Sequence, residues 1–118
     1  MKRLAFLASG LIVTVAAAIP GARAYAHPPI DVVASNWKFT PNEITTKVGE
    51  ETTLRVSSAE GVHGIQSDDL GIPSTTIVPG KTVDVTFTPK KAGTYVAHCS
   101  VLCGAGHADM KLTVKVES

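Results

Sequence analysis

The chain has 118 residues, of which 44% are hydrophobic and 18% charged, and its formal net charge is +1 at pH 7. Three of its eleven basic residues and none of its ten acidic residues precede residue 27, so residues 27–118 carry a net charge of about −2. This small negative charge gives no electrostatic reason to expect nucleic acid or an anionic membrane as a partner.

The first 26 residues, "MKRLAFLASGLIVTVAAAIPGARAYA", have the layout of a secretory signal peptide. Lys2 and Arg3 precede an uncharged, mostly apolar run over residues 4–19, and a small-x-small pattern ends at Ala26. The alternative is a membrane anchor that is retained, but the run is shorter than the roughly 20 residues that span a bilayer. We therefore expect export, to the periplasm or a similar compartment, with residues 27–118 as one domain. The membrane would be a partner only if this segment is retained.

Residues 27–118 show the alternation of β-strands and no sustained helical period. Gly and Pro interrupt the pattern every 8 to 12 residues, as expected for short strands joined by turns. In residues 82–89, for example, Val83, Val85 and Phe87 should face inward and the threonines outward. The fold class is predicted to be all-β, a Greek-key sandwich or flattened barrel. The expected strands are residues 31–39, 43–48, 52–58, 75–78, 82–89, 93–99 and 110–116.

The loop between the last two expected strands, "CSVLCGAGHADM", holds both cysteines of the chain. Cys99, Cys103, His107 and Met110 are spaced four, four and three residues apart. Thiolate, imidazole and thioether are the donors that select copper, and sometimes zinc. In an exported protein two cysteines usually form a disulfide, but a disulfide gives no reason for His107 and Met110.

A metal site of this kind needs a ligand from elsewhere in the chain, and His63 in "EGVHGIQ" is the candidate. We expect it in a loop, between Gly61 and Gly64, that lies beside the 99–110 loop. His98 directly precedes Cys99 and should therefore point to the opposite face of its strand. His27 would be the new N-terminus if cleavage follows Ala26.

With these residues in view, "CSVLCGAGHADM" resembles the binuclear copper loop of cytochrome c oxidase subunit II, whose pattern is C-x-x-x-C-x-x-x-H-x-x-M. "GVHG" resembles the upstream histidine segment of that family, and the likeness extends over roughly residues 31–117. The resemblance implies a cupredoxin-type fold with two copper ions, a CuA-type centre. Cys99 and Cys103 would bridge the two ions and His63 and His107 would supply nitrogens, while Met110 would be a weak thioether ligand. Val101 would contribute only its backbone carbonyl.

The resemblance also implies electron transfer without catalysis by this chain alone. Expected partners are a redox donor such as a c-type cytochrome, an oxidase catalytic subunit and a copper chaperone. The sequence departs from the family at Val101, where an acidic or amide side chain is usual, and in lacking the family's N-terminal transmembrane hairpin. Its aromatic segment is reduced to Trp37 and Phe39, and we expect Trp37 to pack at the sandwich edge rather than to accept electrons.

Several alternatives stay open at this point. A mononuclear blue copper site would use His63, one cysteine, His107 and Met110. A copper trafficking module would use the same donors to hand metal over. Zinc held by His63, Cys99, Cys103 and His107 would leave Met110 unused. A catalytic copper at His27 is the weakest alternative. Before metal binds, the two cysteines could also rest as a disulfide that needs reduction.

Overall fold

The computed structural model describes residue 10 and residues 27–118. The segment for which we predict a signal peptide therefore lies, apart from Gly10, outside the described residues, and its cleavage stays a prediction. Within the described part of the chain, no helix is both long enough and apolar enough to cross a bilayer.

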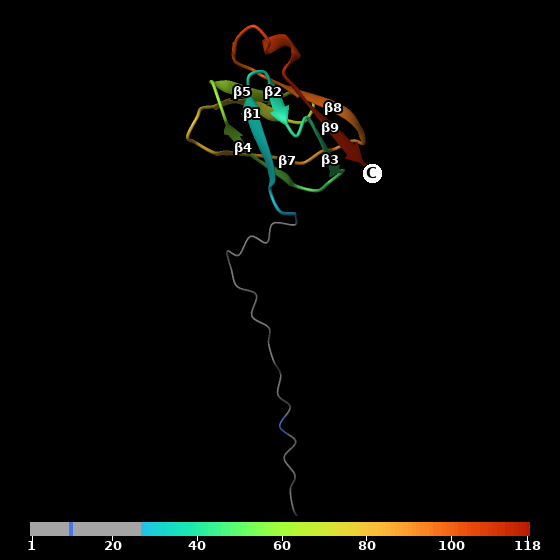
Figure 1. Ribbon diagram of the computed structural model, residues 1–118. Helices are drawn as coiled ribbons and strands as arrows, with labels where there is room; N and C mark the ends of the chain where they lie inside the picture. The colour runs from blue at the N-terminus through green and yellow to red at the C-terminus, as the bar shows by residue number, and fades with distance from the viewer. Residues whose placement is uncertain (1–9, 11–26) are drawn as a thin grey trace, which may run out of the picture.

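Nine strands and one short 3-10 helix make up the fold, so the predicted all-β class is confirmed (Figure 1). A four-stranded sheet has the order β2-β1-β4-β7 and a five-stranded sheet the order β3-β9-β8-β5-β6. Two of the pairings are parallel, β1 with β4 and β3 with β9. The elements are β1 (Ile30–Ser35), β2 (Lys38–Thr40), β3 (Glu43–Lys47), β4 (Thr52–Ser58), β5 (His63–Ser67), β6 (Ile72–Ile77), β7 (Val83–Phe87), β8 (Gly93–His98), η1 (His107–Asp109) and β9 (Lys111–Glu117).

Alternation along the strands produces the core between the two sheets. In β9, Leu112, Val114 and Val116 are buried, while Lys111 and Lys115 are exposed. In β7, Val85 and Phe87 face inward and Asp84 and Thr86 face solvent, as predicted. Because side chains on one face of a strand repeat every second residue, each strand contributes one apolar row to the same core.

Two predictions about the strands were wrong in detail. Residues 31–39 form two antiparallel strands, β1 and β2, because the chain turns at Asn36 and Trp37. Residues 63–67, which we expected to be a loop, form β5, and β6 begins three residues before the predicted strand. The glycine and glutamine of "HGIQS" interrupt the alternation of apolar and polar residues, so the local sequence does not predict a strand. The strand forms because it pairs with β6 and β8.

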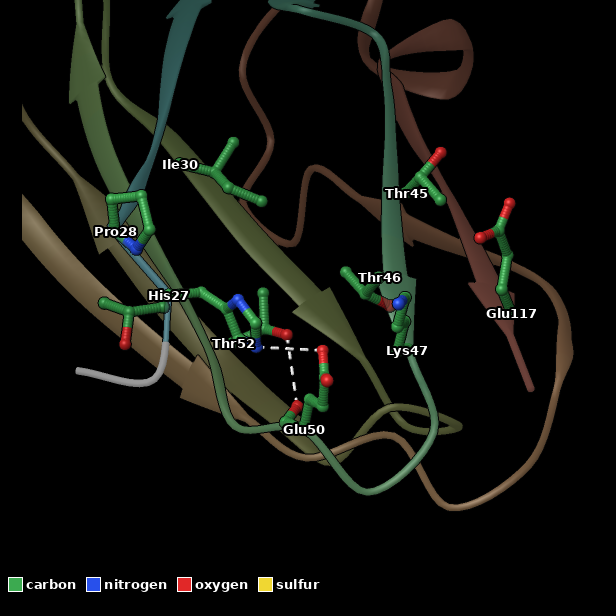
Figure 2. A pocket seen from close by; sticks show the side chains of 10 residues that line it. His27, Pro28, Ile30, Thr45, Thr46, Lys47, Glu50, Thr52 and Glu117 are labelled. Carbon is green, nitrogen blue, oxygen red and sulfur yellow. Dashed lines mark hydrogen bonds and ion pairs between the residues drawn. The ribbon is translucent and has the colours of Figure 1, made fainter. Parts of the chain in front are cut away.

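The two ends of the sandwich differ in what they carry. The 99–110 loop, with η1, lies at one end, above the turn that joins β1 and β2 (Figure 1). At the other end a cavity of about 390 Å³ opens between β1, β3 and β4, with His27 and Glu50 paired beside it (Figure 2). The loop between β8 and β9 therefore projects from a rigid body, which is where such folds place their functional residues.

Candidate metal centre

His63 is the first residue of β5 and is fully buried, which corrects the prediction that it lies in a loop. Its Nε2 lies 2.8 Å from the carbonyl oxygen of Glu60. A carbonyl can only accept a hydrogen bond, so Nε2 carries the proton and Nδ1 presents a lone pair. Nδ1 is buried and has no hydrogen-bond partner. A buried polar atom normally has a partner, so this nitrogen has a free lone pair that a metal ion could use.

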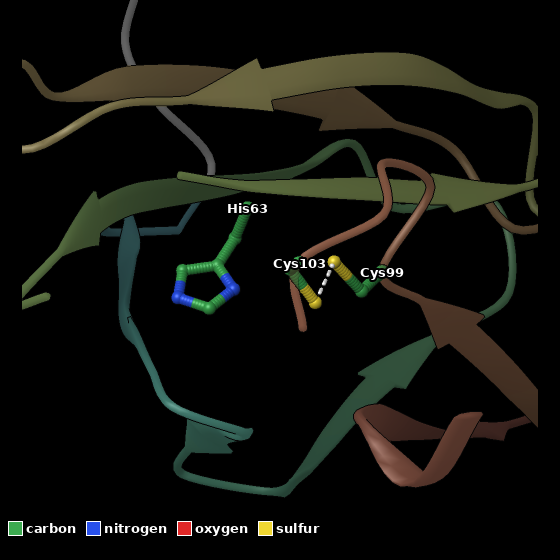
Figure 3. A group of neighbouring side chains, drawn as sticks. All are labelled: His63, Cys99 and Cys103. Carbon is green, nitrogen blue, oxygen red and sulfur yellow. Dashed lines mark hydrogen bonds between the residues drawn. The ribbon is translucent and has the colours of Figure 1, made fainter. Parts of the chain in front are cut away.

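The thiols of Cys99 and Cys103 face this ring (Figure 3). Cys99 directly follows β8 and is buried, and Cys103 is half-buried. Both cysteines are free, and their sulfur atoms are 2.9 Å apart. Ligand atoms of His63, Cys99 and Cys103 all lie within 4.8 Å of one another. Residues separated by about 40 positions in the sequence thus present one imidazole and two sulfurs to a common point.

His107 and Met110 complete the donor set from the far side of the loop. His107 Nδ1 is 3.4 Å from the sulfur of Cys103, and Met110 Sδ is 3.8 Å from the same sulfur. Backbone bonds shape this part of the loop: the amide of His107 donates to the Gly104 carbonyl, and the amide of Cys99 donates to the Met110 carbonyl. The second of these bonds closes the loop at its base. His107 and Met110 each reach the sulfur of Cys103, but His107 is not part of the group of ligand atoms that lie within 4.8 Å of one another.

Two backbone groups also point at the cysteine sulfurs. The carbonyl oxygen of Val101 accepts a hydrogen bond from Cys99 Sγ at 3.3 Å. The amide of Gly64 donates to the same sulfur at 3.4 Å.

In the metal-free protein, Cys103 is a poor acid. Burial, reinforced by the hydrogen bond that Cys103 shares with Cys99 and by the charge of that neighbour, raises the pKa of Cys103 from 9.0 to about 11. At neutral pH the thiol is therefore protonated, and a metal that binds it has to displace the proton.

The donor set fits a copper centre by its own chemistry. Two thiol sulfurs, two imidazole nitrogens and a thioether are soft or borderline donors, the preference of copper. Among the described residues, the group of close ligand atoms contains no carboxylate, the donor that Mg²⁺ and Ca²⁺ prefer. The unpaired Nδ1 of His63 is the atom that a metal would satisfy.

The other two histidines are not brought to this site. His98 ends β8 with its side chain exposed, as the alternation predicted, and Cys99 after it is buried. His27 lies at the opposite end of the sandwich, where its Nε2 is 2.9 Å from Glu50 Oε2.

Besides His63, sequence reasoning also misplaced Trp37. Its indole Nε1 donates to the carbonyl oxygen of Cys103 at 2.8 Å, so the side chain lies on the 99–110 loop rather than at the sandwich edge. Spacing could not reveal this, because 66 residues separate the two positions. The sequence signal that could have indicated this contact is the pair of glycines at 104 and 106, because a large side chain can pack there only where the loop residues have no side chains of their own.

Comparison with known proteins assigns the chain to a protein family. Residues 4–114 match the Cupredoxin-like domain family, so the chain belongs to that family. More particularly, it is similar to cytochrome c oxidase subunit 2 of Thermus thermophilus, with 30% identity over 86 residues, 73% of this chain and 63% of that protein. It is also 30% identical over 79 residues to subunit 2 of Cereibacter sphaeroides, of which it covers 26%. The chain thus spans less than two thirds of the length of these relatives.

Solved structures agree on the fold. The periplasmic domain of subunit II of cytochrome oxidase from Bradyrhizobium japonicum superimposes with a TM-score of 0.69 at 21% identity, over 76% of this chain and 83% of that one. A heme-copper terminal oxidase dimer matches with a TM-score of 0.66 at 22% identity, over 93% of this chain and 84% of that one. The chain is therefore a cupredoxin domain that resembles the soluble domain of cytochrome c oxidase subunit II.

Proposed function

We propose that this chain is an exported electron-transfer protein that carries a binuclear copper centre of the CuA type. The observation that supports it most is the convergence of three groups, the unpaired Nδ1 of His63 and the sulfurs of Cys99 and Cys103, within 4.8 Å. Two sulfurs beside one another, each with further donors within reach, suit two ions better than one. Two copper ions bridged by two thiolates share a single electron, so bond lengths change little when it arrives.

The residues of the chain would divide the work as follows. Cys99 and Cys103 bridge the ions, His63 and His107 each bind through Nδ1, Met110 supplies a distant sulfur and Val101 its carbonyl oxygen. The Glu60 carbonyl holds the ring of His63 in one tautomer and one orientation. The stiff sandwich keeps these donors fixed while the charge changes. The donor set leaves no open position for a substrate, which favours electron transfer over catalysis.

Exposed apolar side chains at the same end suit a transient redox partner. Leu102 is 89% exposed and directly precedes Cys103, while Val62 is 50% exposed and directly precedes His63. We propose a c-type cytochrome or similar donor for this surface, and an oxidase catalytic subunit as a further partner.

A thiol-handling partner is proposed as well. One solved relative, with a TM-score of 0.63 at 19% identity, is a mixed disulfide intermediate between a thioredoxin-like protein and subunit II of cytochrome c oxidase. In this chain the two sulfurs are 2.9 Å apart, close enough to oxidise to a disulfide in an oxidising compartment. A reductant would then have to reduce the disulfide before a copper chaperone delivers the metal. Export to the periplasm, an oxidising compartment, is consistent with this need.

Reconstitution with copper under reducing conditions tests the proposal. We expect two copper ions per chain, a purple colour and an electron-spin spectrum in which one unpaired electron is shared between two copper nuclei. One copper per chain with a single-nucleus spectrum would establish the mononuclear alternative. Rapid loss of copper to a mild chelator in both oxidation states would favour trafficking, and preference for zinc over copper would contradict the proposal.

A further inference from the structure

Trp37 lies in the turn between β1 and β2 and packs on the backbone of the 99–110 loop. Its Nε1 donates to the Cys103 carbonyl at 2.8 Å. A Cβ placed on Gly104 would lie 2.7 Å from Nε1, and one placed on Gly106 would lie 2.5 Å from the ring atom Cγ. Both distances are too short for real carbon contacts, so the indole fits because these two positions are glycine.

The same turn also contacts the segment that leads to His63. The amide of Asn36 donates to Glu60 Oε1 at 3.1 Å, and a Cβ on Gly61 would lie 2.9 Å from Asn36 Oδ1. The carbonyl of Glu60 in turn fixes the ring of His63. Two adjacent residues of one turn therefore reach both segments that carry donor atoms.

The indole bond differs from the other bonds of the loop tip. Within the described chain, the remaining hydrogen bonds of residues 101–109 stay inside the loop, such as those from His107 to Gly104 and from Asp109 to Gly106. Val101 and Cys103 also pack partly against the core, but among the described residues the bond from Trp37 is the hydrogen bond that joins this tip to the sandwich. Loops fixed by few contacts to the body of a protein open locally at small free-energy cost.

We propose that Trp37 is a positioning residue that latches the Cys103–Gly106 segment onto the sandwich, and that release of this latch limits how fast the loop opens to take up or lose metal. The metal part of this inference rests on the copper site proposed above, whereas the latch itself does not. Trp37 acts here through the backbone of Cys103, by holding its sulfur beside those of Cys99 and Met110.

The first test uses the metal-free, reduced protein and measures how fast iodoacetamide alkylates Cys103 at a fixed pH. Trp37→Phe keeps an aromatic ring and removes the N–H donor, so the rate should rise about 2- to 10-fold, the equilibrium worth of one neutral hydrogen bond. Trp37→Ala removes the bond and the ring, and the rise should exceed about tenfold. Alkylation rates that rise from wild type to Trp37→Phe to Trp37→Ala would show that both the hydrogen bond and the packing of the ring hold the loop.

Gly106→Ala tests the same contact from the other side. Its added methyl would strike the indole, and the backbone at Gly106 is not one of the positive-φ positions of the chain, so the substitution is free of that strain. Trp37 is the single tryptophan of the chain, so its fluorescence reports its own environment. We expect a red-shifted emission together with faster alkylation of Cys103.

Val33→Ala is the matched control. Val33 lies on β1, is 36% exposed against 40% for Trp37, and faces outward from the same hairpin. It should leave both the alkylation rate and the fluorescence unchanged. Thermal unfolding of every variant separates local opening from a general loss of stability, because a latch variant should alkylate faster even at temperatures well below its melting transition.

In the copper-loaded protein the same variants should lose copper to a chelator faster, in the same order as the alkylation rates. If Trp37→Ala leaves the alkylation of Cys103 within twofold of wild type, the latch is wrong, whatever the copper content. If alkylation rises but no variant binds two coppers, the latch stands and the proposed function fails. If alkylation rises while copper loss is unchanged, Trp37 does not control metal exchange and that half of the inference is overturned.

Discussion

Two histidines, one at each end of the sandwich, show what separates a ligand from an ordinary polar residue. His63 is fully buried, its Nε2 is bound to a carbonyl and its Nδ1 is left without a partner beside two sulfurs. His27 is half exposed and pairs with the carboxylate of Glu50, which is also partly exposed (Figure 2). An exposed pair of this kind contributes little to stability. Thr46 at the His27 end also has a buried, unpaired oxygen, so what distinguishes His63 is an unpaired nitrogen beside two sulfurs.

Replacing Cys103 by serine should have the largest effect at the functional end. A hydroxyl does not bridge two copper ions as a thiolate does, so the stoichiometry should fall from two coppers per chain to one or none, and the purple colour should be lost. Metal counting and the visible spectrum measure this. Retention of two coppers and of the colour in Cys103→Ser would contradict the assigned bridge.

The two histidines can be compared directly. His63→Ala should lower copper affinity by at least about tenfold, because it removes a donor that the fold holds in place. His27→Ala should leave affinity and spectrum unchanged and alter stability by less than about 0.5 kcal/mol, as surface substitutions usually do. Competition with a chelator measures the affinities. Equal losses of copper affinity in His63→Ala and His27→Ala would contradict the assignment of the metal site to the His63 end.

Titration of Cys103 should make the metal-free protein sensitive to alkaline pH. Because burial raises the pKa of Cys103 from 9.0 to about 11, the folded state holds its proton more tightly than the unfolded chain. Its contribution to stability is therefore complete below pH 9 and is lost as the pH rises through about 11. Urea unfolding of wild type and Cys103→Ser across this range measures it, since the lysines and tyrosines titrate in both proteins. Parallel curves for the two would show that the thiol is not perturbed.

Leu102→Glu tests the apolar surface without touching a donor atom. We expect the rate of electron transfer with a c-type cytochrome to fall several-fold, while the copper spectrum stays as in wild type. Val96→Glu, on an exposed position of β8, is the control and should change the rate less. A slower rate accompanied by an altered spectrum would mean that Leu102 shapes the site instead.

Val101→Ala should have the smallest effect. The proposed ligand at this position is the backbone carbonyl, which the substitution retains. Copper stoichiometry should be unchanged and the visible bands should shift only slightly. If Val101→Ala disrupted the spectrum more than Cys103→Ser, the assignment of roles would be reversed.

The parts of this fold that could be predicted are those in which local pattern and burial agree. The alternation of β7 and β9 placed their buried faces correctly, and the spacing of Cys99, Cys103, His107 and Met110 put the donors in one loop. These features depend on neighbours in the sequence, which is the information that periodicity and spacing contain.

The parts that could not be predicted depend on contacts between distant segments. Nothing local marks His63 as the buried start of a strand, because β5 is defined by its pairing with β6 and β8. Nothing local places Trp37 on the glycines of a loop 66 residues away. The first depends on pairing within the five-stranded sheet and the second on how the two sheets are stacked.

The unpaired Nδ1 of His63 bears on whether the protein folds before or after it binds metal. The strands and the Glu60 carbonyl hold the ring in place without help from a metal. Leaving one buried atom unpaired costs about 1–3 kcal/mol, a modest fraction of the roughly 5–15 kcal/mol by which domains are stable. The sandwich can therefore fold without metal, and a metal ion that binds later would find the ligand atoms already in position.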